Sequence, residues 1–371
     1  MSTSSTTTPA RQRSAASMQR SKSPLLTIFA LPKPFLGHIG VIQRNAIRSW
    51  TALGDEVEVI LFGDEVGTAQ YARELGVRHV PEIRRNEQGT PLLDDVFATA
   101  TATAKGDVLL YANSDIVFTP DLVDSIKRVR TASLDQYLLI GRRVDLDVTE
   151  MIDFEHSSWE AQLIETALRD GTLAPVVCKD YFGFERGQYA SIPAFAVGRG
   201  NWDNWMVHHA NEQRIPVIDC TESITAIHQN HGYQHLRRGR LEAYVNGAEA
   251  EENRRLAGGR HLVSGSGATW QLNSESPVPL NRSIASSFYR DLPGFVQLLG
   301  QLFLGRKPSR RAKLPNNLRA SAKRNVASGL DDGEKSTKSK LMSSAVNEAG
   351  VRQRGDFDPS RSSSKRARIL R

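Results

Sequence analysis

The segment Asn113-Ser114-Asp115 has the residue types best suited to bind a metal ion in this chain. It follows the apolar run 107–112, which is typical of a buried strand, and a helix is expected to begin near Asp121. Polar side chains at the carboxyl end of a parallel strand face the ligand-binding edge of an α/β sheet. Carboxylate and amide oxygens suit Mg²⁺ or Mn²⁺, which often share a substrate phosphate. The same three residues also suit a turn that caps the next helix, so both roles stay open here.

Asp203 is the candidate catalytic base. It follows Trp202 and precedes Asn204, directly after the glycine-containing loop 198–201. Glycine lets a backbone approach a ligand closely, tryptophan can stack on the apolar face of a sugar, and a carboxylate can accept a hydroxyl proton. The alternative is that Asp203 only caps the helix expected to start there.

Two further acids follow or open predicted strands. Asp64 comes after the strand 57–62, where a carboxylate could hydrogen-bond a ribose or a base, or could cap the next helix. Asp180 opens the aromatic strand 180–184. An anionic ligand would also need cations, and the candidates are Lys33, Arg142 and Arg143.

Histidines are concentrated in one late segment. His228 ends the apolar run 224–227, and His231 and His235 follow it. Without a cysteine or a paired glutamate this spacing is not a specific zinc signature. We therefore expect His228 to supply one metal ligand, beside Asn113 and Asp115.

The charge of the chain is unevenly distributed. Its formal net charge is +7, but residues 1–24 and 306–371 are basic, with +4 and +12, while the middle carries −9. An acidic domain that binds a diphosphate needs a cation or local Lys and Arg side chains. The two cysteines, Cys178 and Cys220, match no metal-ligand spacing and predict no disulfide framework. The sequence shows no spanning apolar run and no secretory signal, so a cytoplasmic location is expected.

Strand and helix patterns alternate through the first third of the chain. Strands are expected at 25–31, 57–62, 77–80 and 107–112, separated by helices at 39–53, 66–75 and 91–104. This alternation predicts an α/β fold with a mostly parallel, Rossmann-like sheet flanked by helices. Further along, the patterns predict strands at 136–142, 180–184 and 215–218, and helices at 157–170, 202–213 and 239–257.

Composition divides the chain into four parts. Residues 1–24 are expected to be disordered, 25–257 to form the folded domain, 258–305 to be a poorly defined extension, and 306–371 to be a disordered basic tail. The tail has no interleaved aromatic residues, so base stacking is not predicted for it. Its charge suits an anionic surface, which would place the protein peripherally at a membrane.

Residues 25–236 resemble the nucleotide-diphospho-sugar transferases of GT-A type, closest to a glycosyltransferase-like family of bacteria and plants. The resemblance rests on the order and spacing of segments 30–34, 43–50, 60–64, 111–116, 180–184, 198–205 and 228–231. It implies a GT-A fold, a divalent metal (Mn²⁺ or Mg²⁺), a nucleotide-sugar donor, and a glycan, lipid or small-molecule acceptor.

The resemblance also implies residue roles. Asp64 would contact the nucleoside, Asp115 the metal, Asp203 the acceptor hydroxyl, and His228 would complete the metal shell. The chain departs from the pattern where Asn113 replaces the first acid of the D-x-D element.

Two other functions fit parts of the sequence. A sugar-phosphate nucleotidylyltransferase shares the sheet and the metal turn, but the loop 32–40 carries a lone lysine, Lys33, instead of a glycine-rich basic phosphate loop. A non-catalytic protein that binds nucleic acid or anionic lipid would use the basic tail.

Overall fold

The computed structural model describes residues 23–232, 247–259, 267–280 and 314–322. The chain divides into two compact units, Met1–Ser321 and Ala322–Arg371, and all described residues except Ala322 belong to the first. The sequence predictions for 1–22 and 323–371 lie outside the described residues.

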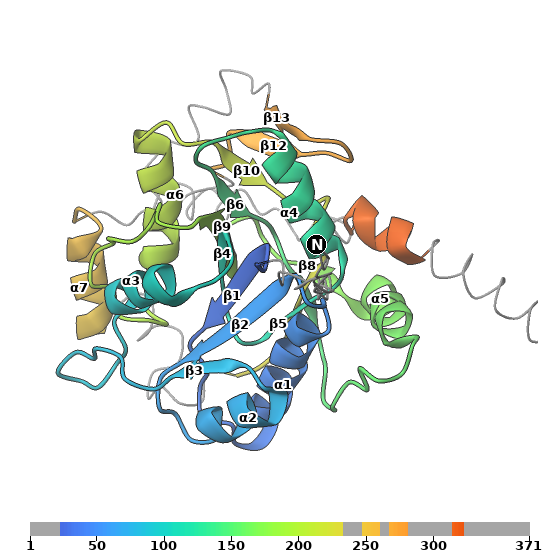
Figure 1. Ribbon diagram of the computed structural model, residues 1–371, viewed down its shortest axis with the longest axis horizontal. Helices are drawn as coiled ribbons and strands as arrows, with labels where there is room; N and C mark the ends of the chain where they lie inside the picture. Colours follow the sequence, from blue (N-terminus) through green and yellow to red (C-terminus); the bar gives the residue numbers. More distant parts are fainter. Residues whose placement is uncertain (1–22, 233–246, 260–266, 281–313, 323–371) are drawn as a thin grey trace, which may run out of the picture. The chain divides into compact units, whose positions relative to one another are not determined.

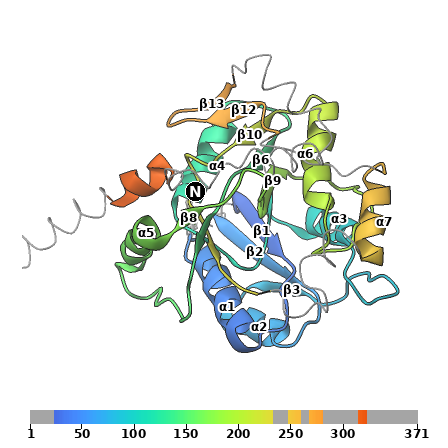
Figure 2. The same ribbon diagram turned by 180° about the vertical axis from the view of Figure 1, so that it is seen from behind.

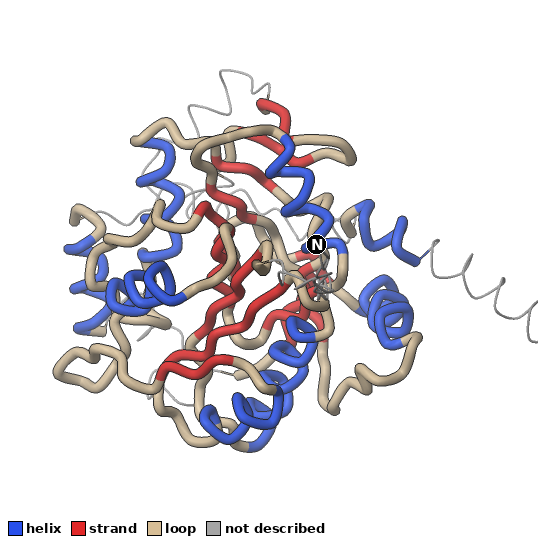
Figure 3. Tube along the Cα trace, in the orientation of Figure 1, coloured by secondary structure: helices blue, strands red, loops and turns tan. Residues whose placement is uncertain are grey.

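A nine-stranded sheet forms the centre of the first unit (Figure 3, strands in red). Its order is β13-β12-β10-β6-β9-β4-β1-β2-β3. The strands are β1 (Leu26–Ala30), β2 (Val57–Phe62), β3 (Arg78–Val80), β4 (Val108–Ala112), β6 (Leu138–Ile140), β9 (Tyr181–Glu185), β10 (Val217–Asp219), β12 (Trp270–Leu272) and β13 (Pro277–Pro279). The pairs within β4-β1-β2-β3 and β6-β10-β12 are parallel, whereas β9 and β13 are antiparallel to their neighbours. The predicted α/β fold with a mostly parallel sheet is confirmed.

Helices cover both faces of this sheet (Figures 1 and 2). One core cluster joins α1 (Gly37–Thr51), α2 (Thr68–Leu75) and α4 (Asp121–Thr131) to alternate residues of β1, β2 and β4. The other joins α3 (Leu93–Thr103), α6 (Trp202–Glu212) and the end of α7 (Ala248–Leu256) to the remaining residues of the same strands. A two-residue side-chain period on strands buried from both sides explains their continuous apolar runs.

A second, four-stranded sheet has the order β5-β11-β7-β8. Its strands are β5 (Ile116–Phe118), β11 (Ala226–Gln229), β7 (Val144–Leu146) and β8 (Thr172–Leu173), and α5 (Trp159–Asp170) packs near β7. β11 lies between β5, to which it is antiparallel, and β7, to which it is parallel. This sheet therefore joins the end of β4 to a segment more than a hundred residues later.

The predicted domain boundaries differ from the structure at the C-terminal side. β12 and β13 lie in the predicted extension 258–305 but belong to the large sheet, and Leu272 is fully buried. Residues 316–322 are helical within the predicted disordered tail, and Leu318 is 1% exposed. Asn317 Nδ2 donates to Thr225 Oγ1 at 2.9 Å and to Asp121 Oδ2 at 3.3 Å. The folded unit thus extends beyond residue 257, because strand pairing, hydrogen bonds and buried leucines join these segments to it.

Across the described ranges, the longest and most apolar helices still fall short of what a bilayer crossing requires.

Candidate metal centre and surrounding site

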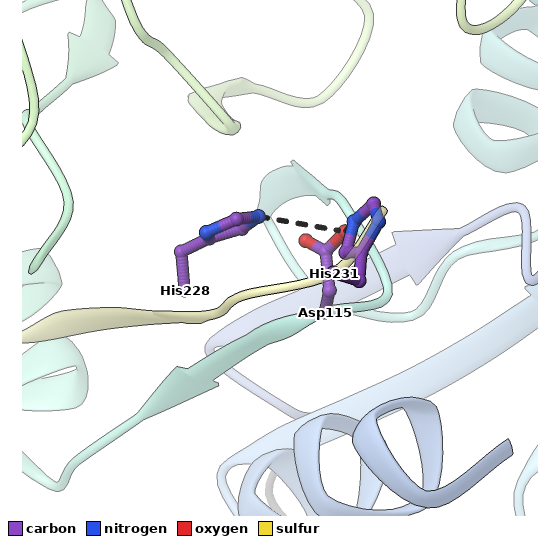
Figure 4. A group of neighbouring side chains, drawn as sticks. All are labelled: Asp115, His228 and His231. Atoms are coloured by element: carbon purple, nitrogen blue, oxygen red, sulfur yellow. Dashed lines mark hydrogen bonds and ion pairs between the residues drawn. The ribbon is translucent and has the colours of Figure 1, made fainter. Parts of the chain in front are cut away.

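Three side chains that could ligate a metal converge beside the end of β4 (Figure 4). Asp115 lies in the turn between β4 and β5, His228 on β11, and His231 just after that strand. The antiparallel register pairs His228 with Ile116, which brings it next to Asp115. One ligand atom from each of the three residues lies within 4.8 Å of the others.

Only one oxygen of the largely buried Asp115 carboxylate contacts the two histidines. His231 Nε2 lies 3.0 Å from Oδ2, and His228 Nε2 lies 4.0 Å from the same atom. Asp115 Oδ1 is buried and has no hydrogen-bond partner among the described residues. An orphaned buried carboxylate oxygen is costly unless a cation or a donor joins it.

The charge state of Asp115 also suits a cation. Burial alone would raise the pKa of its carboxyl. The hydrogen bond from His231 and the charges of His228, Lys33 and His231 more than offset burial, so the pKa lies well below its ordinary value. Asp115 is therefore an anion throughout the neutral range.

These residues fit a divalent metal ion. One carboxylate and two imidazoles can fill up to half of an octahedral shell, which leaves positions for a phosphate or for water. Imidazole nitrogen is a more usual ligand of transition metals than of Mg²⁺, which is a hard cation that prefers oxygen ligands. Of the two predicted ions, the donor set favours Mn²⁺.

Buried polar residues on α1 hold the Asp115 turn in place. Gln43 Oε1 accepts from Ser114 Oγ at 2.8 Å and from the Lys33 backbone N–H at 2.6 Å, while Gln43 Nε2 donates to the Lys33 carbonyl at 2.7 Å. Trp50 Nε1 donates to the Ile116 carbonyl at 2.9 Å. The loop carrying Lys33 and the turn carrying Asp115 are thus fastened to one helix.

A chain of charged side chains runs from this turn to β7. Asn113 Nδ2 donates to Asp180 Oδ1 at 2.7 Å, and Arg143 Nη1 donates to Asp180 Oδ2. Arg143 Nε also donates to Asp145 Oδ1 at 2.8 Å. Although burial opposes its charge, the two carboxylates hold the pKa of Arg143 above its ordinary value.

Two predicted roles concern residues of this chain. The guanidinium of Arg143 lies between two carboxylates and only 12% of its side chain is exposed, so its contact with a diphosphate remains a prediction. The Asn113 amide group is turned toward Asp180, and His231 joins Asp115 and His228 in the cluster instead. Whether Asn113 also contacts a metal remains a prediction.

The candidate base Asp203 lies in the first turn of α6. The N-cap position is Asn201, in a left-handed conformation with φ of 80°. Burial raises the pKa of the Asp203 carboxyl, while Lys179 and backbone hydrogen bonds in the first turn partly offset the rise. The charge of Asp180 raises this pKa further. Asp203 accepts backbone hydrogen bonds within the first turn of its own helix but does not occupy the N-cap position. Its role as the catalytic base remains a prediction.

Trp202 is part of the core, and its predicted stacking on a sugar remains a prediction. It is 6% exposed and contacts Tyr111 and Phe182, with ring centroids 5.1 and 5.2 Å away. The side chain at the first position of α6 points toward the sheet because that face of the helix covers it. Asn204, two positions later, is half-buried, and its predicted contact with a sugar is untested.

Asp64 and Arg142 occupy more open positions. Asp64, with 71% of its side chain exposed, pairs with Arg85 and lines a pocket of about 500 Å³ that also includes Glu82, Arg84 and Asp95. It does not cap α2, whose N-cap is Gly67. Arg142 Nε donates to the Ala174 carbonyl at 2.7 Å, and the residue is half-buried. The predicted ligand contacts of both residues remain predictions.

Sequence patterns did not identify two residues of the site. His231 is one of three histidines in its segment, and only the structure shows that this one contacts Asp115. Asp145 lies 2.9 Å from His228 Nδ1 through its Oδ1 atom. The sequence around Asp145 has no motif that marks it. Asp145 joins the site because β7 and β11 are parallel and their register pairs it with His228.

No protein-family model and no curated protein matches the sequence. Among solved structures, glucosyl-3-phosphoglycerate synthase from Mycobacterium tuberculosis, with Mn²⁺, uridine diphosphate and glucosyl-3-phosphoglycerate, is 15% identical over 71% of this chain and 89% of that chain, with a TM-score of 0.37. TarS 1–349 of S. aureus is 14% identical over 33% of this chain and 36% of that chain, with a TM-score of 0.26. The match thus spans about a third of TarS 1–349. At such values neither structure assigns a ligand or a residue role to this chain.

Proposed function

We propose that this protein is a glycosyltransferase that uses a nucleotide-diphosphate sugar and a divalent metal ion. The observation that carries the proposal is the Asp115–His228–His231 cluster, with one unsatisfied carboxylate oxygen, at the carboxyl end of a parallel strand. That edge is where α/β sheets bind phosphorylated ligands. The motif resemblance to GT-A enzymes supports the same function.

The metal would be held by Asp115, His228 and His231. When bound, such an ion supplies Lewis-acid neutralisation of a leaving diphosphate. The positive charge of Lys33 lowers the pKa of the Asp115 carboxyl, so Lys33 is near enough to help neutralise a diphosphate at this site. Arg142 would contribute to the same neutralisation, while Arg143 would keep Asp180 and Asp145 in position.

The acceptor would bind near Asp203. A base works best when its pKa approaches the working pH, and burial moves the pKa of Asp203 in that direction. The carboxylate would take the proton of an acceptor hydroxyl as the glycosidic bond forms. Asp64, in the pocket beyond β2, would contact the nucleoside.

Calorimetry with UDP, GDP and CDP, each with and without Mn²⁺, tests this proposal. We expect at least one of these nucleotides to bind only in the presence of Mn²⁺, and Asp115→Ala to abolish that binding. Asp124→Ala is the matched control, because Asp124 is an exposed acid on α4 and should leave binding unchanged. Absence of binding by all three nucleotides with Mn²⁺ or Mg²⁺, or full binding by Asp115→Ala, contradicts the proposal.

A further inference from the structure

His228 lies between two carboxylates. Its Nε2 atom faces Asp115, 4.0 Å from Oδ2, and its Nδ1 atom is 2.9 Å from Asp145 Oδ1. His228 Nδ1 makes no hydrogen bond of good geometry among the described residues, but Asp145 Oδ1 is near enough to accept its proton.

Asp145 is also bound by an arginine. Arg143 Nε donates to the same Oδ1 atom at 2.8 Å, and Arg143 Nη1 reaches Asp180, which accepts from Asn113. The side chains of Arg143 and Asp180 are 12% and 10% exposed, so this chain of contacts is largely shielded from water. It begins on β7 and ends in the turn that carries Asp115, so it links both sides of the cluster.

We propose that Asp145 is the positioning residue that makes His228 an Nε2 metal ligand, with Arg143 and Asp180 holding Asp145 in place. The inference rests on the proposed metal site. A carboxylate that accepts the Nδ1 proton of an imidazole fixes its tautomer, orients the ring and strengthens Nε2 as a donor. Loss of such a partner weakens metal binding by roughly 10- to 100-fold.

A purely structural role for Asp145 predicts other results. The side chain is 27% exposed, so its removal opens no buried cavity. A structural role would lower stability without changing the histidine tautomer. A positioning role changes the tautomer and metal affinity while most of the stability remains.

Metal binding and NMR on the full chain separate these roles. Mn²⁺ affinity, measured by calorimetry without nucleotide, should fall roughly 10- to 100-fold in Asp145→Ala and less in Asp145→Asn, whose amide oxygen can still accept a hydrogen bond. Histidine ¹⁵N spectra of the metal-free protein at mildly alkaline pH should show His228 as the Nδ1–H tautomer in the wild type and not in Asp145→Ala.

Asp147→Ala is the matched control for charge. Asp147 lies two positions further along, is more exposed, and accepts from Asn230 instead of His228. Equal loss of Mn²⁺ affinity in this variant would reduce the effect to long-range charge and overturn the inference. Wild-type affinity or an unchanged tautomer in Asp145→Ala overturns it while leaving the proposed function standing. Absence of Mn²⁺ binding by the wild type overturns the inference; the proposed function is overturned as well only if no nucleotide binds with Mn²⁺ or Mg²⁺.

Discussion

Replacing Gln43 with leucine should destabilise the protein and loosen the candidate metal site together. Gln43 is 1% exposed and makes three hydrogen bonds, two to the Lys33 backbone and one from Ser114 Oγ. Leucine has a similar size but no polar atom. The substitution therefore leaves three groups unsatisfied instead of creating a cavity.

The magnitude follows from those three groups. Each unsatisfied buried polar group costs about 1–3 kcal/mol. Lys33 is half-buried, so water can replace part of what its backbone loses. We expect the free energy of unfolding to fall by about 2–5 kcal/mol, and the melting temperature to fall by roughly 4–20 °C at about 2–4 °C per kcal/mol.

Thermal and urea unfolding of matched variants measure this effect. Gln70→Leu is the control, since Gln70 is exposed on α2 and bonds only Glu74 among the contacts described. Ser114→Ala should cost only about 0.5–1.5 kcal/mol, because a single hydrogen bond is lost. If Gln43→Leu unfolds within about 0.5 kcal/mol of Gln70→Leu, the normal range for surface changes, the reasoning that Gln43 fastens the Lys33 loop to the Asp115 turn is refuted.

Three further predictions concern the acceptor side and the C-terminal segment. Asp203→Asn should keep donor affinity and lower the transfer rate by roughly 10²–10⁴-fold if Asp203 is the base; transfer at the wild-type rate would leave it only a structural role. Because the folded-state pKa of Asp203 is raised, its contribution favours folding below the ordinary value of 3.8 and is lost as pH rises through the folded-state pKa. Asp203→Asn should therefore raise the melting temperature at pH 7–8, and should raise it by a smaller amount at acid pH. Thermal melts from acid pH to pH 8 measure this difference. Deletion of 323–371 should leave the melting temperature unchanged. Deletion of 314–371 should lower it, because this deletion also removes buried Leu318. Equal melting temperatures of the two deletion variants would show that 314–322 adds nothing to stability.

The local patterns predicted most of the large sheet. β1, β2 and β4 are mostly apolar, and their apolar residues divide between the two core clusters as expected for strands covered on both sides. The patterns gave no partner for β9, which enters antiparallel between β4 and β6. Composition also hid β12, because three residues in a Gly- and Ser-rich stretch carry little periodic signal.

Site residues could be predicted from the sequence where they lie at the end of an apolar strand. They could not be predicted where only the pairing of distant strands brings them to the site. Asp115 follows an apolar run, and His228 ends another, so both stand out in the sequence. Asp145 becomes a neighbour of His228, and His231 a neighbour of Asp115, only when β11 pairs with β7 and β5. The burial of Trp202 was not predicted, because residue type alone does not reveal that α6 turns this side chain toward the sheet.

The position of β11 also sets the order in which the site can assemble. β11 inserts between β5 and β7, so this sheet is incomplete until the chain has been synthesised past residue 229. Asp115 and His231 are 116 positions apart, and contacts of such separation form late and slowly, because a long loop must close first. The nascent chain can thus pair β1, β2 and β4 before it can hold a cation at Asp115. Metal capture would follow pairing of β1, β2 and β4 and stabilise the completed four-stranded sheet, so added Mn²⁺ should slow unfolding more than it speeds refolding.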